Sequence, residues 1–332
     1  MNAMTDVDDR LDADIREALA ATPFPGVTAE NLLTFRAERY GAPIDPALLS
    51  DQVERRSIQI PGPDGDPEIT IRIHRPVAAT GAMPCMFWMH GGGMVMGTEF
   101  QDDLRFDRWC VRHNIMAVSV NYRLAPETPY PGAIEDCYAA LVWVHQNADE
   151  LGIDPHMIGV GGASAGAGLS AALTLVARDR GLPGPAIFSQ LLIYPMLDHR
   201  QSTISSSWEV PIWPPSANTF GWDAYLGDLD RTNVPAYASP ALADDLSDLP
   251  AAYVMVGALD GFVDEDIEYA MRLNRAGVDV EFHLYPGAPH GFEGLLPGAS
   301  VSKQATADIH NWIKKTYTPR LFARQATMVL GA

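Results

Sequence analysis

The chain has 332 residues, a length that fits two average domains or one large α/β domain with insertions. Hydrophobic residues make up 47% and charged residues 20%, so the chain has enough apolar side chain to bury a core. With 42 acidic against 23 basic residues the formal charge is −19, which argues against nucleic acid or an anionic membrane as a partner.

Targeting signals and disulfides are not indicated either. No apolar run reaches the ~18 residues that a membrane-spanning helix needs. The first twenty residues are rich in aspartate and lack the basic start and apolar stretch of a secretory signal. Three cysteines are too few, and odd in number, for a disulfide framework. We therefore expect a soluble, cytoplasmic protein with no membrane span.

Apolar runs of strand length recur along the chain, with helical patterns between them. The second run alternates apolar and polar residues, whereas later runs such as 116–120 and 253–256 are almost continuously apolar, which is typical of parallel strands covered on both faces. Helical periodicity at 132–148 and 264–276 separates them. The pattern predicts an α/β fold with an eight-stranded, mostly parallel sheet flanked by helices. The expected strands lie near 57–60, 68–74, 84–89, 115–121, 157–161, 187–194, 251–256 and 279–285.

Two stretches do not fit the sheet pattern. Residues 1–50 read as helical and precede the first strand, while residues 198–247 interrupt the alternation with serine, proline and tryptophan before a helical pattern near 216–226. An insertion of this length is too long for an ordinary loop, so we expect it to act as a lid. Residues 321–332 are left as a C-terminal tail.

A glycine-rich pentapeptide is the first chemical motif. Residues 162–166 read Gly-Ala-Ser-Ala-Gly and lie between the strand at 157–161 and a helical pattern from Leu169 to Ala177. Gly-x-Ser-x-Gly in this context is typical of a nucleophile elbow, a sharp turn that exposes the serine hydroxyl. Ser164 is therefore the predicted nucleophile, with a small-residue turn that carries no chemistry as the alternative.

The same residues overlap a second pattern. Residues 166–171 match the dinucleotide fingerprint Gly-x-Gly-x-x-Ala. This match lies inside the predicted helix, and no acidic residue ends a second strand ~20 residues later. We therefore expect neither a dinucleotide nor another cofactor. Cys110 and His113 lack a second pair of ligands, so no metal site is expected.

A second glycine cluster follows the predicted strand at 84–89. His90 is followed by Gly91, Gly92 and Gly93. Consecutive glycines let backbone N–H groups face a ligand with no side chain in the way, and this motif forms the oxyanion hole of lipases and esterases. A flexible turn is the alternative. We expect His90 to orient the loop by hydrogen bonding and not to titrate in catalysis.

Three motifs taken together resemble a known family. In their order along the chain they are similar to those of the bacterial hormone-sensitive-lipase-like carboxylesterases, esterase family IV. The resemblance runs from about residue 55 to 315 and is looser before that. It implies an α/β-hydrolase catalytic domain at 51–197 and 248–320, with a helical cap built from residues 1–50 and 198–247. The motifs are His90-Gly91-Gly92-Gly93, Tyr122-Arg123-Leu124-Ala125-Pro126-Glu127 and Gly162-Ala163-Ser164-Ala165-Gly166.

The resemblance also assigns roles to residues around the serine. It implies that Gly92, Gly93 and Ala165 supply the oxyanion donors. We expect Glu127 to form an ion pair or hydrogen bond under the glycine loop, which His90 and Gly91 also support. The family usually has Asp or Thr where this chain has Ala163, so a polar side chain beside the nucleophile is absent.

The acid and the base follow from motif order, because an α/β-hydrolase places Ser first, then Asp or Glu, then His. Asp260 lies in the loop just after the strand at 251–256, whereas Asp264 to Asp266 begin a helix and are explained as N-terminal charges. Asp260 also aligns with the family's acid. His290 lies in a glycine-rich loop after the last strand, so Ser164, Asp260 and His290 are the predicted triad.

These residues predict a serine carboxylesterase for short- to medium-chain esters, working through an acyl-enzyme. An amidase or lactonase with the same triad, and a non-catalytic receptor of hydrolase fold, remain as alternatives. Met94, Trp208 and Trp213 are the expected pocket residues. The last strand, 278–285, lies at a sheet edge and alternates apolar side chains, so we also expect a homodimer formed through it.

Overall fold

The structure of the chain is a computed structural model that describes residues 7–21, 24 and 26–330. Residues 1–6, 22, 23 and 25 of the predicted N-terminal cap segment, and residues 331 and 332 of the predicted tail, lie outside the described residues. Over the described part, no helix combines the length and the apolar character that crossing a bilayer requires.

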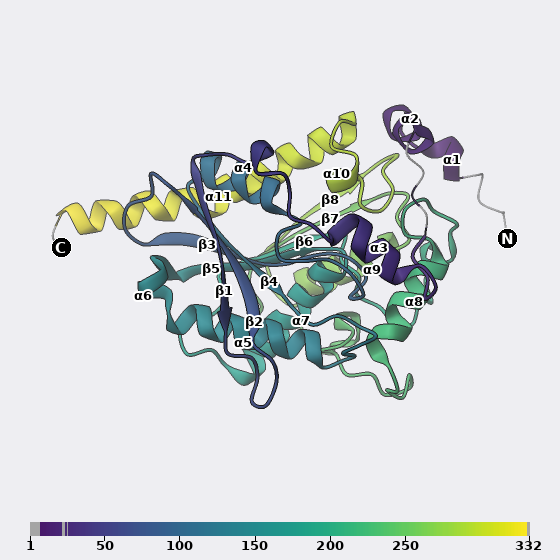
Figure 1. The fold of residues 1–332 in the computed structure, drawn as a ribbon, viewed down its shortest axis with the longest axis horizontal. Helices are drawn as coiled ribbons and strands as arrows, with labels where there is room; N and C mark the ends of the chain where they lie inside the picture. The colour runs from purple at the N-terminus through teal and green to yellow at the C-terminus, as the bar shows by residue number, and fades with distance from the viewer. Residues whose placement is uncertain (1–6, 22–23, 25, 331–332) are drawn as a thin grey trace.

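One eight-stranded sheet forms the centre of the molecule (Figure 1), with strand order β1-β2-β4-β3-β5-β6-β7-β8. The first two strands pair antiparallel, β2 also pairs antiparallel with β4, and every pair from β4 to β8 is parallel. The predicted mostly parallel sheet is therefore confirmed. The strands are β1 Val53–Ile60, β2 Ile69–Pro76, β3 Met83–Met89, β4 Met116–Asn121, β5 Ile153–Ala163, β6 Gln190–Ile193, β7 Ala252–Gly257 and β8 Val280–Tyr285.

Helices cover both faces of the sheet. Figure 1 shows α4 and α11 on one face and α5 and α7 on the other, while α1, α2, α3 and α8 gather at one end. The helices are α1 Val7–Arg10, α2 Ala13–Ala21, α3 Leu32–Tyr40, α4 Asp103–His113, α5 Gly132–Gln146, α6 Ala148–Leu151, α7 Ala165–Arg180, α8 Pro215–Leu226, α9 Val263–Arg275, α10 Phe292–Leu295 and α11 Ser300–Leu330. Short 3-10 turns lie at Pro46–Leu48, Ser205–Ser207 and Pro240–Leu242.

The central strands are apolar because both of their faces are covered. All seven residues of β3 are buried. Two consecutive residues of this strand, Phe87 and Trp88, belong to different apolar clusters on opposite faces of the sheet. Phe87 packs with the cluster that contains Leu141 of α5, and Trp88 with the cluster that contains Trp312 of α11. Continuous apolar runs in the sequence thus correspond to two-sided burial.

Several element boundaries differ from the sequence expectation. β1 begins at Val53, four residues before the expected start. Residues 54–56 are charged, which an edge strand tolerates, but they interrupt the apolar run from which the strand was predicted. β5 runs on through Ala163, since pairing with both β3 and β6 holds its glycines extended. Helix α11 continues through Leu330, where we had expected a tail from residue 321.

The N-terminal segment contacts two loops of the sheet domain. The N–H of Asp12 donates to the carbonyl of Gly287 at 2.9 Å, in the loop that leads to His290. From α3, Arg36 donates to the carbonyl of Val95 at 2.6 Å, just beyond the glycine cluster. These contacts place the start of α2 and helix α3 beside both predicted catalytic loops.

Candidate active site

A strained turn joins β5 to α7 and carries Ser164. Its φ of 56° and ψ of −122° lie in a region that side-chain-bearing residues rarely adopt, at a cost of order 1–3 kcal/mol. The turn requires glycine on both sides. A Cβ on Gly162 would clash with the backbone of Gly166, and a Cβ on Gly166 would clash with the carbonyls of Met89 and His90. The sequence motif therefore reflects steric crowding that presents the hydroxyl.

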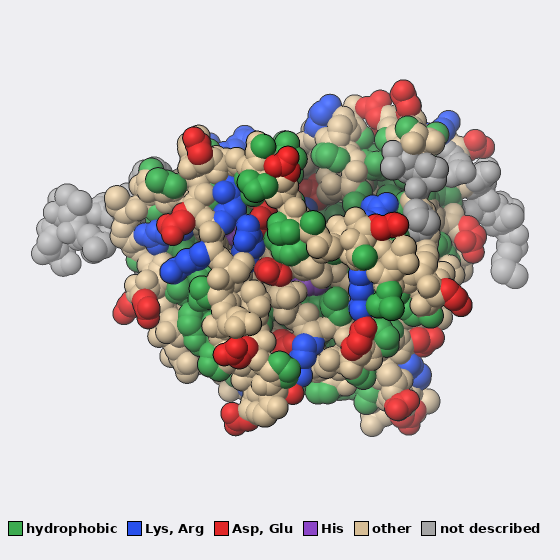
Figure 2. Space-filling view, viewed as in Figure 1, with side chains coloured by type: hydrophobic (Ala, Val, Ile, Leu, Met, Phe, Trp, Pro, Cys, Tyr) green, Lys and Arg blue, Asp and Glu red, His purple; other side chains and the backbone are tan. Residues whose placement is uncertain are grey.

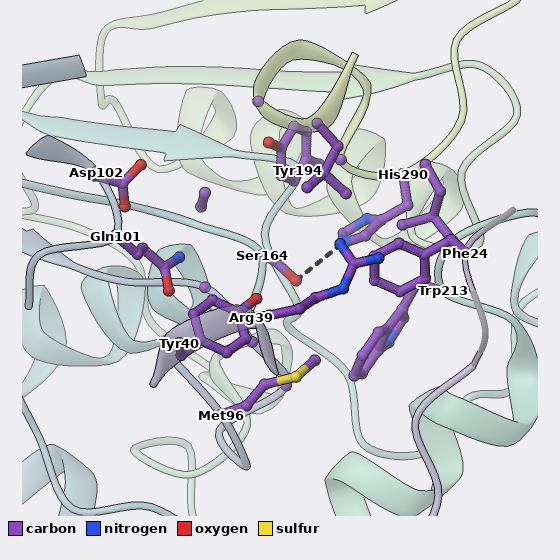
Figure 3. A pocket seen from close by; sticks show the side chains of 18 of the residues that line it. Phe24, Arg39, Tyr40, Met96, Gln101, Asp102, Ser164, Tyr194, Trp213 and His290 are labelled. Carbon is purple, nitrogen blue, oxygen red and sulfur yellow. Dashed lines mark hydrogen bonds between the residues drawn. The ribbon is translucent and has the colours of Figure 1, made fainter. Parts of the chain in front are cut away.

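Ser164, His290 and Asp260 form a hydrogen-bonded row. Ser164 Oγ lies 2.9 Å from His290 Nε2 (Figure 3), and His290 Nδ1 lies 2.7 Å from Asp260 Oδ2. The other Asp260 oxygen, Oδ1, accepts the N–H of Phe262 at 3.0 Å. All three side chains are buried, with Asp260 only 1% exposed. The arrangement can move a proton from the hydroxyl to the imidazole while the carboxylate holds the ring.

The other acidic residues near this loop contact different groups. Asp264 accepts the N–H of Ser205 at 2.9 Å, and Glu265 accepts the N–H of Leu197 at 2.8 Å. Burial raises the pKa of Asp266 well above its ordinary value. Asp260 is therefore the carboxylate that the structure brings to the imidazole.

Aromatic rings fix the imidazole from several sides. Tyr194 and Phe262 make edge contacts with His290 at centroid distances of 4.9 and 5.0 Å, and Trp213 lies 6.3 Å away. Tyr194 has a φ of 38° at the end of β6, a second strained residue at the site. It was not among the predicted site residues.

The glycine cluster lines the cavity beside Ser164. Gly92 and Gly93 have φ of 126° and 60°, and their N–H groups donate no hydrogen bond to another described residue. Ala165 is the first residue of α7, so its N–H has no acceptor one turn back. Gly92 and Gly93 thus line the same cavity as Ser164, and within the described residues the N–H groups of all three predicted oxyanion donors have no acceptor. A Cβ on Gly93 would clash with Trp213.

His90 supports this loop as a neutral ring. Its Nδ1 lies 3.0 Å from the carbonyl of Gly91, and its ring stacks on Tyr122 at 4.1 Å. Complete burial lowers the pKa of His90 to about 4, so the ring carries no charge near neutral pH. Tyr122 in turn donates its hydroxyl to the His90 carbonyl at 2.7 Å.

Glu127 reaches the loop through an arginine. Both of its oxygens accept from the Arg36 guanidinium, at 2.7 and 2.9 Å. The same guanidinium donates to the carbonyls of Val95 and Ala125. The hydrogen bonds from Arg36 lower the pKa of Glu127. Glu127 therefore holds the cation that ties α3 to the glycine loop.

A cavity of about 280 Å³ opens over Ser164. Trp213 lines it, whereas Met94 and Trp208 are not among its lining residues: Met94 is buried in the core, and Trp208 lies against a smaller hollow beside Phe262. Met96 and Ala163 occupy wall positions instead. Lining residues that the sequence analysis did not identify include Phe24, Arg39, Tyr40, Gln101 and Asp102.

Cys110 and His113, weighed above as metal ligands, serve other contacts. The Cys110 thiol is buried, and His113 Nε2 lies 2.7 Å from His310 Nδ1. Within residues 7–330, apart from the gaps noted above, no three histidine, cysteine or acidic side chains converge as metal ligands do.

A serine on a strand-to-helix elbow, with an imidazole and a carboxylate behind it, defines the α/β-hydrolase class. The family model for the α/β-hydrolase fold matches residues 86–294 of this chain. The chain belongs to the hormone-sensitive-lipase-like branch of that family and is a carboxylic ester hydrolase.

Relatives with an assigned activity support this conclusion. Esterase LipI of Mycobacterium tuberculosis is 34% identical over 300 residues, which cover 89% of this chain and 92% of that protein. Carboxylesterase NlhH of the same species is 34% identical over 302 residues, covering 89% and 93%. The solved structure of a bacterial heroin esterase is 40% identical, covers 93% of this chain and 98% of that chain, and superposes with a TM-score of 0.87.

Proposed function

We propose that the chain hydrolyses short- to medium-chain carboxylic esters through Ser164, His290 and Asp260. His290 Nε2 accepts the hydroxyl proton while Ser164 Oγ attacks the ester carbonyl, and the tetrahedral oxyanion accepts from the N–H groups of Gly92, Gly93 and Ala165. His290 then protonates the leaving alcohol, which departs from the acyl-enzyme. Water attacks the acyl carbon by the same route and restores the serine.

The observation that carries this proposal is the pair of distances through the imidazole, 2.9 Å to Ser164 and 2.7 Å to Asp260. Nucleophile, base and orienting acid all lie within hydrogen-bonding reach before any substrate is bound. Because the serine lies at the floor of a cavity, a small-molecule ester can reach it.

We further propose that residues 1–50 and 198–247 act as a cap that limits the depth of this cavity. Phe24 and Tyr40 from the first segment and Ile212 and Trp213 from the second line it together with the glycine cluster. Each CH₂ group of the acyl chain that is buried against the apolar wall of the cavity contributes about 0.8 kcal/mol of binding free energy. We therefore expect kcat/KM to rise with acyl length until the cavity is full.

A panel of nitrophenyl esters with acyl chains of two to sixteen carbons tests the function and the cap together. We expect kcat/KM to peak near four to eight carbons. Trp213→Ala should move the peak toward longer chains because its ring closes the cavity, and Trp208→Ala, at a tryptophan off the cavity, should leave the peak in place. A wild-type optimum at sixteen carbons would contradict the cap proposal.

We also propose a homodimer formed through β8. This strand is the last in the sheet order, and Leu284 on it is 45% exposed. Light scattering at micromolar concentration should give twice the chain mass, and Leu284→Lys should lower it because a charge on an edge strand disfavours pairing. A wild-type mass of one chain would rule out this dimer.

A further inference from the structure

One cation that lines the catalytic cavity has no anionic partner among the residues that the structure describes. Arg39, in the last turn of α3, lines the cavity together with Ser164 and His290 and is exposed to solvent. Its guanidinium makes no ion pair and no hydrogen bond with any residue that the structure describes. Figure 3 shows it beside the Phe24 ring, on the side of the cavity where His290 and Trp213 lie.

The other charged side chains of this region are already satisfied. Arg105, which also lines the cavity, donates to both oxygens of Glu293 at 2.9 and 3.0 Å and to Asp102 at 3.0 Å. The second Asp102 oxygen accepts from Trp88 at 2.9 Å. One turn before Arg39 on the same helix, Arg36 is held by Glu127.

Aromatic stacking holds the free guanidinium in place. Its central carbon lies 4.3 Å from the ring centroid of Phe24 and 5.1 Å from that of Phe35. The two rings meet edge to face at 5.5 Å. A guanidinium positioned by π contacts keeps its N–H donors for another acceptor, and two parallel N–H groups match a carboxylate. The cation is therefore positioned without being neutralised.

We propose that Arg39 binds an anionic group of the substrate, so that the preferred esters carry a carboxylate besides the ester that is cleaved. This inference rests on the proposed function, because the anion is positioned relative to Ser164. A formal charge of −19 repels anions from the molecule as a whole. At physiological salt that repulsion is screened within about 8 Å, whereas contact with a fixed guanidinium is screened less.

Two matched pairs of esters test the proposal. On the alcohol side, 4-acetoxybenzoate is compared with 4-acetoxybenzamide. On the acyl side, the monomethyl ester of adipic acid is compared with the same ester carrying a primary amide in place of the free acid. Within each pair the scissile ester is the same and a carboxylate is exchanged for a neutral amide of similar size, so the change in the ratio of kcat/KM values, anionic over neutral, between wild type and variant isolates recognition of the carboxylate.

Arg39→Gln should lower this ratio about two- to fivefold in at least one pair, because the anionic ester loses an ion pair that the neutral ester never makes. Arg39→Lys should retain part of the preference, and 0.5 M NaCl should weaken it in the wild type. Arg112→Gln is the matched control: it removes one exposed positive charge from α4, whose residue 112 does not line this cavity, and should leave both ratios unchanged.

An unchanged ratio in both pairs would overturn the proposal, as would an equal loss on anionic and neutral esters, which would assign Arg39 to packing of the cap. Failure of the proposed function looks different. In that case the neutral esters are not hydrolysed by the wild type at all, and no ratio can be formed.

Discussion

Ser164→Ala should lower kcat on any ester of the panel by about 10⁴- to 10⁶-fold, the range seen when the nucleophile of such a triad is removed. The expected effect is this large because every covalent step of the proposed mechanism passes through Ser164 Oγ, and neither His290 nor the glycine loop supplies another nucleophile. The substitution deletes one oxygen and leaves the elbow backbone in place, so the melting temperature should stay close to that of the wild type.

A serine on the helix that follows Ser164 provides the control. Ser170 is buried in α7 and donates its hydroxyl to the carbonyl of Gly166 at 2.8 Å. Ser170→Ala removes the same atom type six residues away and should retain kcat within about tenfold, because the loss of one neutral hydrogen bond costs only ~1 kcal/mol. Turnover near the wild-type level by folded Ser164→Ala would contradict the mechanism.

The sequence predicts the parts of the site that local chemistry determines. Gly162 and Gly166 are required by crowding at the turn itself, so the elbow is readable from five residues and their place between strand and helix. Asp260 and His290 follow β7 and β8, and in a parallel sheet the carboxyl ends of neighbouring strands meet at one edge. The eight strands and their mostly parallel pairing were predictable from the apolar runs that alternate with helical patterns.

Contacts between distant segments could not be predicted in this way. Phe24, Arg39 and Tyr40 reach the cavity from a segment more than a hundred residues before the serine, and nothing in their local pattern indicates that contact. Trp208 and Trp213 look equivalent in sequence, yet only Trp213 lines the cavity. That difference depends on how the chain turns between them, where Ile212 has a φ of 73°.

Asp260→Asn should lower kcat by about 10³- to 10⁴-fold with little change in stability. The carboxylate accepts a hydrogen bond from the N–H of His290 Nδ1, which leaves Nε2 unprotonated and free to accept the Ser164 proton. An amide turned to donate to Nδ1 would select the opposite tautomer, with its proton on the Nε2 that faces the serine. It would also remove the negative charge that stabilises the imidazolium formed in the transition state.

The neighbouring acids decide whether this effect belongs to Asp260. Asp264→Asn changes a carboxylate four residues away that accepts from Ser205, so its effect on kcat should stay below about tenfold. Glu265→Gln alters a buried group that accepts from the N–H groups of Leu197 and Asp198. It should therefore lower the melting temperature and leave kcat close to the wild-type value.

A loss of 10³-fold or more in Asp264→Asn, with Asp260→Asn near wild type, would move the role of the acid to the helix. The 2.7 Å contact between Asp260 and the imidazole argues for the reverse, because only an acceptor in direct contact with Nδ1 can fix the tautomer.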